Sequence, residues 1–306
     1  MTDIQLDAAR ALVRRAIDKA EQLGISGAIA VVGASGALVT ASRMDEGGAG
    51  GLGRARSKAW IAATQRIPST EHLNRMTTLP PAIAAGFVAV SPEAAFPGAG
   101  GMPVRDDTGR ITGAVAASGA TVSPFFPAEL ERRYSTVDGR PANPEDQVVA
   151  YALGVPYVGQ HGDDKPRWEQ RYGPWQDHEA QPPVAVPRAS GQPELDRAVA
   201  LADRVLASGQ PVAVVVVDRR GEVVHEVAAD AAPTAATYVA EGVAAAAALF
   251  GRPSGEAGEL VAAARHVLPV PVVALAGGRP LLGGGALGVA GPDPEVCDRL
   301  AAEALA

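Results

Sequence analysis

The sequence predicts a mixed α/β fold (α+β) built from a duplicated unit, because two hairpin patterns recur with helices around them. Residues 28–45 (AIAVVGASGALVTASRMD) place small and β-branched side chains on both sides of a glycine-centred turn. This is the pattern of two antiparallel strands joined by a short hairpin. The same pattern returns at residues 212–230 (VAVVVVDRRGEVVHEVAAD). With 306 residues, the chain has room for two domains of ordinary size.

The first half begins with a helix, expected over residues 6–23, because apolar residues recur on one face and Gly24 is a suitable C-cap. The first hairpin follows this helix. The glycine-rich residues 47–53 then lead into a second helix, expected over residues 54–66 and ended by Pro68.

A short helix and three strands are expected next. Ser69 is a suitable N-cap for the short helix, and the carboxylate of Glu71 is favoured in its first turn by the helix dipole. The strands are expected near residues 82–90, 102–105 and 110–117.

The first domain is expected to close with a helix over residues 145–153, with Pro144 at its first turn. A polar, proline-bearing insertion at residues 121–142 precedes this helix, and a connector at residues 157–190 follows it. The connector is rich in proline, charge and large aromatic side chains. Because a flexible spacer does not need two tryptophans, we expect it to pack on its own domains or on a second copy of the chain.

The two halves align on three anchors with one offset. Gly36 meets Gly221, Asp45 meets Asp230 and Pro68 meets Pro253, each pair 185 residues apart. The offset then falls to 177 and 172, and it reaches 150 where Pro144 is set against Pro294. The last decrease of the offset, to 150, places the insertion in the first half. We therefore predict domains at residues 1–156 and 191–306, separated by the connector.

Composition and charge exclude several classes of protein. Hydrophobic residues make up 47% of the chain and charged residues 20%, which suits a globular fold, and aromatics are only 4%, so small side chains must fill the cores. A net charge of −7 without a basic stripe argues against a nucleic-acid partner. The chain lacks an apolar run long enough for a membrane span, and it lacks a signal-peptide pattern at its start. The single Cys297 excludes an intrachain disulfide and favours the reducing cytoplasm. It lies at an apolar position of the last helix, and we interpret it as a small core residue rather than a nucleophile.

Several short motifs of the first half resemble the GlcG/HbpS-like haem-binding family, also seen as the C-terminal part of PduO-type proteins. They are Arg43-Met44-Asp45, Lys58-Ala59, Gly100-Gly101-Met102-Pro103, Gly113 and Ser118-Gly119. The resemblance covers nearly everything except the insertion and the connector. It implies that each half is a profilin-like α-β-α domain with a five-stranded antiparallel sheet. It also implies that the protein forms homo-oligomers and binds a small molecule such as haem.

The second half keeps the architecture of the motifs and loses their polar residues. Arg43 is replaced by Ala228, Met44 by Ala229, Lys58 by Val243 and Ser118 by Ala290. Our hypothesis is that the second half is a structural pseudo-subunit, which completes a pseudo-dimer within one chain. The first half would then carry the site.

Arg43, Asp45 and Lys58 are the first candidate site residues. An arginine and a lysine near a strand end suit a carboxylate or a polarised carbonyl, and Asp45 would orient one of them. The alternative is a structural ion pair that ties the hairpin to the second helix. Both interpretations stay open.

A second set comes from the glycine-rich run and the end of the last strand of the first half. Its members would bring strand backbone close to a bound planar ligand: Gly100, Gly101, Pro103, Ser118 and Gly119. The alternative is tight strand packing and turn formation.

The histidines bear on haem binding. PduO-type relatives are thought to place an axial ligand in the first helix, and this chain has no histidine there. His72 is the only histidine that we consider as a ligand or general base in the first half. His161 and His178 lie near carboxylates in the connector, but their spacing matches no metal site that we recognise, so no metal is predicted. Glu131, in the insertion, is a further candidate for proton transfer.

Two function classes remain open. The first is a small-molecule-binding protein, with haem or another planar ligand in the first domain. The second is an enzyme of specialised metabolism without an organic cofactor, an isomerase, lyase or cyclase. There Arg43 and Lys58 would polarise the substrate, and Asp45, His72 or Glu131 would move a proton.

Overall fold

The computed structural model describes residues 3–23, 25–91, 95–96, 98–119, 136–137, 140–141, 144–155, 194–264, 268 and 270–306. The chain forms two compact units. The first comprises residues 1–37 and 50–186, and the second comprises residues 38–49 and 187–306. The expected C-cap Gly24 lies outside the described residues.

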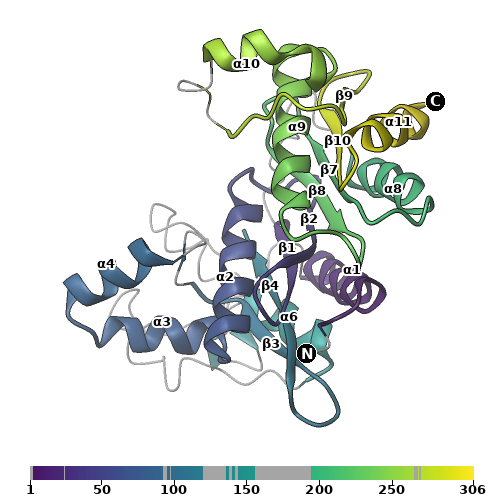
Figure 1. Ribbon diagram of the computed structural model, residues 1–306. Helices are drawn as coiled ribbons and strands as arrows, with labels where there is room; N and C mark the ends of the chain where they lie inside the picture. Colours follow the sequence, from purple (N-terminus) through teal and green to yellow (C-terminus); the bar gives the residue numbers. More distant parts are fainter. Residues whose placement is uncertain are drawn as a thin grey trace. The chain divides into compact units, whose positions relative to one another are not determined.

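The first unit is built on three antiparallel strands (Figure 1). They lie in the order β3 (Gly101–Arg105), β4 (Ile111–Ser118) and β1 (Ala28–Gly33). The register of β1 on β4 runs from Ala28 opposite Ser118 to Gly33 opposite Gly113. Helix α2 (Gly51–Gln65) packs on all three strands, and α1 (Leu6–Gln22) and α6 (Pro144–Leu153) pack on each other and on the sheet.

Small side chains let α2 approach the strands closely. All six residues of β1 are buried, and the helix turns its alanines toward them. Gly101 illustrates the closeness, because a Cβ atom at this position would lie 2.7 Å from the carbonyl oxygen of Lys58. The expectation of cores filled by small residues is confirmed.

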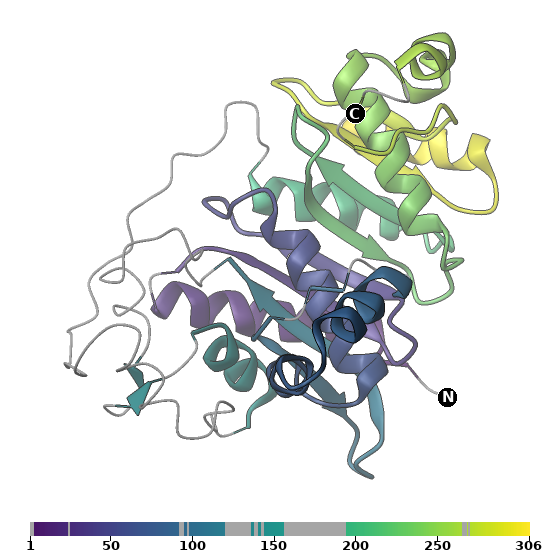
Figure 2. The same ribbon diagram turned by 90° about the vertical axis from the view of Figure 1, so that its left-hand side faces the viewer.

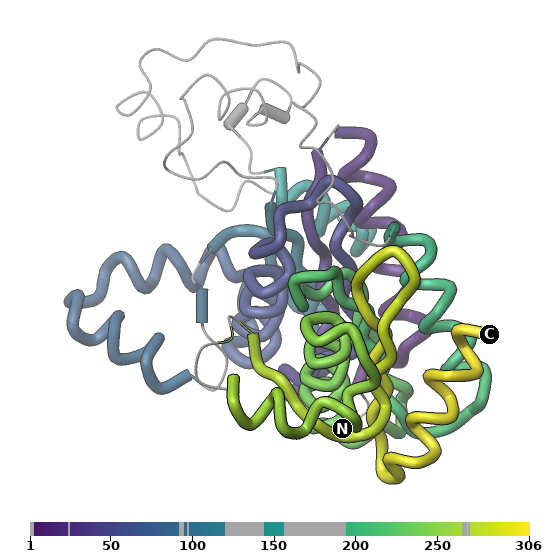
Figure 3. The backbone as a smooth tube through the Cα atoms, turned by 90° about the horizontal axis from the view of Figure 1, so that it is seen from above, coloured from purple at the N-terminus to yellow at the C-terminus, as the bar shows by residue number. Residues whose placement is uncertain are grey.

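Helices α3 (Ser69–Thr77) and α4 (Pro81–Val90) form an arm on one side of the first unit (Figure 3). The strand predicted near residues 82–90 is therefore wrong. An apolar run of this length does not distinguish a buried strand from a helix. Pro81 in the first helical turn, followed by several alanines, favours the helix. None of the side chains of α4 is buried.

Ser69 also differs from its expected role. Helix α3 begins at Ser69 itself, and the serine makes no capping hydrogen bond. Its hydroxyl oxygen instead accepts a hydrogen bond from the backbone N–H of Gly101, at 2.9 Å. The residue therefore ties α3 to the first residue of β3. Two short strands complete the described part of this unit, β5 (Thr136–Val137) and β6 (Arg140–Pro141), which pair with each other.

The described residues of the second unit form five antiparallel strands, and one of them, β2, comes from the first hairpin. The order is β2 (Leu38–Arg43), β8 (Val223–Ala228), β7 (Ala213–Val217), β10 (Ala286–Ala290) and β9 (Gly278–Pro280). The expected five-stranded sheet is thus not found among the described residues of the first unit. Strand β2 belongs to the second unit, where it pairs with β8, and the residues expected to form a further strand form α4.

The helices of the second unit cover both faces of its strands, as Figure 2 and Figure 1 show from two sides. Helix α9 (Ala236–Phe250) packs on β7 and β10, while α8 (Leu195–Leu206) and α11 (Pro294–Leu305) pack on each other. The short η1 (Ser254–Glu256) and α10 (Gly258–Ala264) follow α9. Within the described parts of the chain, no helix is long and apolar enough to cross a membrane.

Candidate functional site

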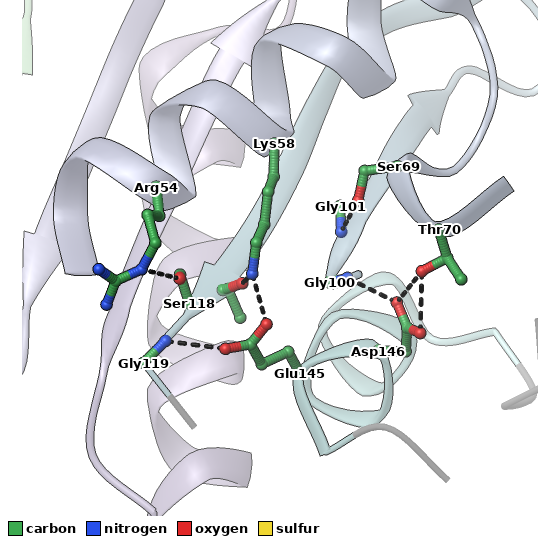
Figure 4. A network of polar contacts seen from close by, with 11 residues as sticks. Arg54, Lys58, Ser69, Thr70, Gly100, Gly101, Ser118, Gly119, Glu145 and Asp146 are labelled. Carbon is green, nitrogen blue, oxygen red and sulfur yellow. Dashed lines mark hydrogen bonds and ion pairs between the residues drawn. The ribbon is translucent and has the colours of Figure 1, made fainter. Parts of the chain in front are cut away.

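A network of polar side chains connects four elements of the first unit (Figure 4). We call it the first-unit network, and its members are Arg54 and Lys58 of α2, Thr70 of α3, Ser118 of β4, and Glu145 and Asp146 of α6. Except for Arg54, all of these side chains are buried. Their arrangement makes this region the candidate site.

Lys58 and Glu145 form a buried ion pair at the centre of the network. The exposed fractions of the two side chains are 2% and 1%. The ammonium of Lys58 donates to the Glu145 carboxylate and to the carbonyl oxygen of Ala117, the latter at 3.2 Å. The second carboxylate oxygen of Glu145 accepts from the N–H of Gly119 at 2.8 Å. Because α6 begins at Pro144, Glu145 also lies in its first turn, where the helix dipole favours a negative charge.

Asp146 lies beside this pair and carries a perturbed carboxyl group. It accepts hydrogen bonds from the N–H of Gly100 at 2.8 Å and from the hydroxyl of Thr70 at 3.1 and 3.2 Å. Burial raises the pKa of Asp146 from 3.8 to about 6, with the nearby Glu145 adding to the rise, while the hydrogen bonds and Lys58 oppose it. The carboxyl therefore exchanges its proton close to neutral pH.

His72 lies in α3, two residues after Thr70. Its ring packs against Phe87 of α4, with 4.9 Å between the ring centroids. The side chain is buried, and its Nε2 atom has no hydrogen-bond partner among the described residues. Burial lowers the pKa of His72, and the charge of Arg75 adds to the effect. Both effects favour the neutral imidazole over the charged one.

Arg43 and Asp45 belong to the second unit, whereas Lys58 belongs to the first. The guanidinium of Arg43 pairs with the carboxylate of Asp218, at the end of β7, at 3.0 Å, and both side chains are buried. Asp45 accepts a hydrogen bond from the N–H of Leu195 at 2.8 Å, at the start of α8. The predicted set of three is thus divided between the units, and the acid paired with Arg43 was not foreseen.

The glycines of the second predicted set bring backbone segments close together. Gly100 and Gly119 have φ angles of +102° and +107°, which favour glycine, and the N–H of each donates to a carboxylate of α6. Pro103 pairs with Ala114 in the sheet. Ser118 accepts a hydrogen bond from Arg54 at 3.4 Å. These contacts match the tight-packing interpretation, and a role in ligand contact stays a prediction.

Several candidates lie outside the described residues. They are Glu131, His161, His178, the connector at residues 157–190, and the insertion at residues 121–142 except for the four residues of β5 and β6. Cys297 is buried in α11 as expected, and burial raises the pKa of its thiol. Within the ranges that the structure describes, no group of three or more histidine, cysteine or acidic side chains is placed to hold a metal ion.

Four members of the network were not predicted as site residues: Arg54, Thr70, Glu145 and Asp146. A comparison of the two units would have found Arg54, Thr70 and Glu145, but not Asp146, because the second unit has Asp298 at that position. The Cβ of Glu145 lies next to Gly100, and the Cβ of Cys297 lies next to Gly277 in the same way. In the closing helices α6 and α11, equivalent residues are therefore 152 positions apart, not 150. The two prolines that begin the helices are not equivalent, because α11 begins two residues earlier in its repeat than α6 does in the first.

At these equivalent positions, the second unit has mostly apolar or smaller residues in place of the network. The equivalents of Arg54, Lys58, Thr70, Ser118, Glu145 and Asp146 are Val239, Val243, Gly255, Ala290, Cys297 and Asp298. The hydrogen bond from Gly101 to Ser69, in contrast, is retained as one from Gly278 to Ser254, also 2.9 Å long. The second unit thus forms the same helix–strand contacts without the buried ion pair.

The contrast argues that the fold does not require the network. Moving a lysine and two carboxylates out of water carries a large desolvation penalty, and apolar side chains of similar volume often serve the fold as well. The second unit uses Val243 and Cys297 at the positions of Lys58 and Glu145, both nearly inaccessible to solvent. Asp298, the equivalent of Asp146, is retained and pairs with Arg279. Retention of the Lys58–Glu145 pair in one unit only is what a functional site in that unit explains.

A family model described as "Haem degrading protein HbpS-like" matches residues 4–123 and 195–306. The matched segments are the two halves of the repeat, without most of the insertion and without the connector. No curated protein matches the chain.

Three solved structures are similar to parts of the chain. The Klebsiella pneumoniae protein ORFY is 21% identical, with 50% of this chain and 90% of that chain covered and a TM-score of 0.40. A PduOC–haem complex is 21% identical, with 52% and 99% covered and a TM-score of 0.39. A double mutant of HbpS from Streptomyces reticuli is 27% identical, with 41% and 96% covered and a TM-score of 0.34.

Proposed function

Because the chain belongs to the HbpS-like family of haem degrading proteins, we propose that it binds a small molecule in its first unit, with haem as the first ligand to test. The observation that carries the proposal is the first-unit network. A buried lysine and two buried carboxylates occupy one repeat, and apolar or smaller residues occupy most of the equivalent positions of the other. Charges that the fold does not need are a common mark of a functional site.

His72 is the residue that would hold the iron. Helix α1 has no histidine, so an axial ligand from the first helix is not available in this chain. The buried Nε2 of His72 lacks a partner among the described residues, and the low pKa keeps the imidazole in the neutral form that binds metals. Phe87 and the apolar helix α4 beside it suit a planar hydrophobic ligand. When bound, haem would supply a redox-active iron centre.

A haemin titration tests this proposal. We expect the wild-type protein to bind haemin saturably, with a shift of the Soret band. The variant His72→Ala should weaken binding by about tenfold or more, because the iron loses its nitrogen ligand. Thr77→Ala is the matched control, since Thr77 lies on the same helix, is exposed and does not act on the pKa of His72. Equal affinity of His72→Ala and wild type would exclude His72 as the ligand, and no saturable shift in the wild type would exclude haem.

A second candidate function is acid–base catalysis without an organic cofactor, and the carboxyl of Asp146 favours it. With a pKa of about 6, this group takes up and releases a proton near neutral pH. The Lys58 ammonium lies in the same network and would polarise a carbonyl oxygen. The ring of Phe96 lies 5.9 Å from that ammonium and is itself 44% exposed, so the ammonium lies one side chain below the surface. Arg43 is not part of this version, because it is paired with Asp218 in the second unit.

The chemistry of this second function is proton transfer next to a carbonyl group. The Asp146 carboxylate would take a proton from the adjacent carbon, Lys58 would donate a hydrogen bond to the enolate oxygen, and a proton would return to carbon. We expect the protein to accelerate exchange of the methyl protons of pyruvate in D2O, followed by NMR. Asp146→Asn should lose about a hundredfold of that acceleration, while Arg75→Gln keeps it. A wild-type rate equal to that of buffer would rule this function out.

The second half is proposed as a structural pseudo-subunit in a pseudo-dimer formed by one chain. Loss of the network at Val243, Ala290 and Cys297, together with retention of the Ser254–Gly278 hydrogen bond, supports this role. Homo-oligomerisation is also a proposal, supported by α4, whose ten residues include no charge and no buried side chain. A cytoplasmic location and a role in specialised metabolism remain predictions from the sequence.

A further inference from the structure

Strands β2 and β8 occupy equivalent places in the two repeats, and they pair with each other in a symmetric register. Three residue pairs define it: Thr40 opposite Val227, Ala41 opposite Glu226, and Ser42 opposite His225. At the repeat offset of 185 residues, Thr40 is equivalent to His225, Ala41 to Glu226 and Ser42 to Val227. Exchanging the two strands therefore maps the pairing onto itself, as in an isologous interface between identical subunits. The same edge would thus be available, in principle, for two copies of either strand.

The side chains at these equivalent positions are different and complementary. Ser42 Oγ and His225 Nδ1 lie 3.0 Å apart, and the hydroxyl of Thr40 donates to the carbonyl oxygen of Glu226 at 3.0 Å. All four side chains are buried. The bond of Thr40 goes to a backbone carbonyl, which any strand supplies, but the Ser42–His225 bond joins two side chains and has no equivalent between two identical strands. Pairing of β2 with itself would set Thr40 against Ser42, and pairing of β8 with itself would set His225 against Val227.

The charged side chains next to this strand pair are also complementary between β2 and the β8 side. Arg43 at the end of β2 pairs with Asp218 at 3.0 Å, and both are buried. The repeat equivalents of these residues are Ala228 and Gly33, which carry no charge. Asp218 is also held in place, because its other carboxylate oxygen accepts the N–H groups of Arg220 and Glu222. The ion pair therefore exists only when a β2 strand meets a β8 strand.

Pairing of either strand with a copy of itself would break the Arg43–Asp218 pair, and pairing of two β8 strands would also set two glutamates against each other. Two β8 strands in this register would set Glu226 directly opposite Glu226, and each Asp218 would lack an arginine. Two β2 strands would bury Arg43 without a carboxylate. Like charges directly opposite each other destabilise a strand pair, and a buried charge without its partner is strongly unfavourable. Specificity of this kind requires both a favoured pair and disfavoured alternatives.

We propose that β2 and β8 are a matched pair, in which the β8 edge binds the β2 strand and rejects a copy of β8. The partner that fits this surface is thus defined by its chemistry. It is a strand with a small residue opposite Glu226, a hydroxyl opposite His225 and an arginine within reach of Asp218. The β2 strand of the same chain meets all three requirements. The inference concerns how the chain is assembled, and it does not depend on the proposed ligand.

The test places a second glutamate opposite the first, in the full-length chain. The variants are Ala41→Glu, its neutral isostere Ala41→Gln, Glu226→Ala, and the exchange variant Ala41→Glu/Glu226→Ala. Thermal unfolding is followed by circular dichroism, and hydrogen exchange of residues 223–228 reports on the strand pair itself. Ala41→Gln measures the steric effect of the larger side chain, because Ala41 is fully buried.

Ala41→Glu is expected to melt on the order of 5–10 °C below Ala41→Gln, with faster exchange in residues 223–228. The double variant Ala41→Glu/Glu226→Ala should recover most of that difference in melting temperature. Like the wild type, it buries one carboxylate at this residue pair. Equal melting temperatures of Ala41→Glu and Ala41→Gln would overturn the proposal, because charge would then be irrelevant. Failure of Glu226→Ala to rescue Ala41→Glu would overturn it as well, since the defect would not come from the opposing glutamates.

Discussion

Replacing either member of the Lys58–Glu145 pair alone is expected to lower the free energy of unfolding by about 3–5 kcal/mol. In Lys58→Val, the Glu145 carboxylate stays buried and loses the ammonium of Lys58, while it keeps the hydrogen bond from the N–H of Gly119. In Glu145→Cys, the Lys58 ammonium keeps only the Ala117 carbonyl of its two oxygen acceptors. Each variant therefore leaves a buried charge without its counter-ion. Urea unfolding measures the loss.

The double variant Lys58→Val/Glu145→Cys is expected to recover most of this loss. It copies the combination Val243 and Cys297, which the second unit buries at the equivalent positions. In that unit Gly291 lies near the sulfur of Cys297, as Gly119 lies near Glu145. A double-mutant cycle should thus give strong coupling between the two sites. Additive losses in the double variant would show that the first unit depends on the charges for its packing.

The same double variant separates stability from function. If the network serves a ligand, the double variant folds, yet it binds the ligand of the first unit more weakly than wild type does. If it serves only the fold, haemin affinity and pyruvate exchange stay at the wild-type level once the stability is recovered.

Asp146→Asn is expected to stabilise the protein at neutral pH, by about 3 kcal/mol relative to its effect in acid. The folded-state pKa is raised from 3.8 to about 6, so the protonated carboxyl favours the folded state. The stabilisation that the protonated carboxyl gives the folded state is complete below about pH 3.8 and is lost as the pH rises through about 6. The interval between the two values corresponds to about 3 kcal/mol. Asparagine, which does not ionise, can accept the hydrogen bond from Gly100 and avoids the loss.

Unfolding free energies from below pH 3.8 up to pH 7.5 provide the measurement, and Asp106→Asn is the matched control. The carboxyl of Asp106 is partly exposed, and its hydrogen bond from Thr108 lowers its pKa, so the control should not gain stability as the pH rises. A difference between Asp146→Asn and wild type that does not change with pH would contradict the raised pKa.

The sequence was sufficient for the duplication and most helices, because both depend on local patterns. Anchors such as Gly36 and Gly221 lie in tight turns with positive φ angles, which few residues other than glycine adopt. The apolar stretch at residues 82–90 was misread, since its composition fits a buried strand as well as a helix. Strand β2 pairs with β8, about 185 residues away, and no local pattern reports on such a pairing.

The candidate site was only partly predictable for the same reason. Lys58 was found because the second half lacks it, but its partner Glu145 lies 87 residues further along the chain, beyond the insertion. Arg43 was selected by the same criterion, and it pairs with Asp218 instead. A residue that differs between two repeats can thus have either of two roles: it can bind a ligand, or it can stabilise the pairing of a strand from one repeat with a strand from the other. Only the partners, which the structure supplies, distinguish the two cases.

The hydrogen bond from Gly119 to Glu145 has a consequence for how this chain can diversify. Gly119 stands just before the insertion and Glu145 just after it, and their contact at 2.8 Å closes the base of the intervening segment. With the base fixed, each doubling of such a segment adds only about 0.6 kcal/mol of closure entropy. Descendants of this gene can therefore exchange, shorten or lengthen that stretch while the scaffold beneath it stays intact.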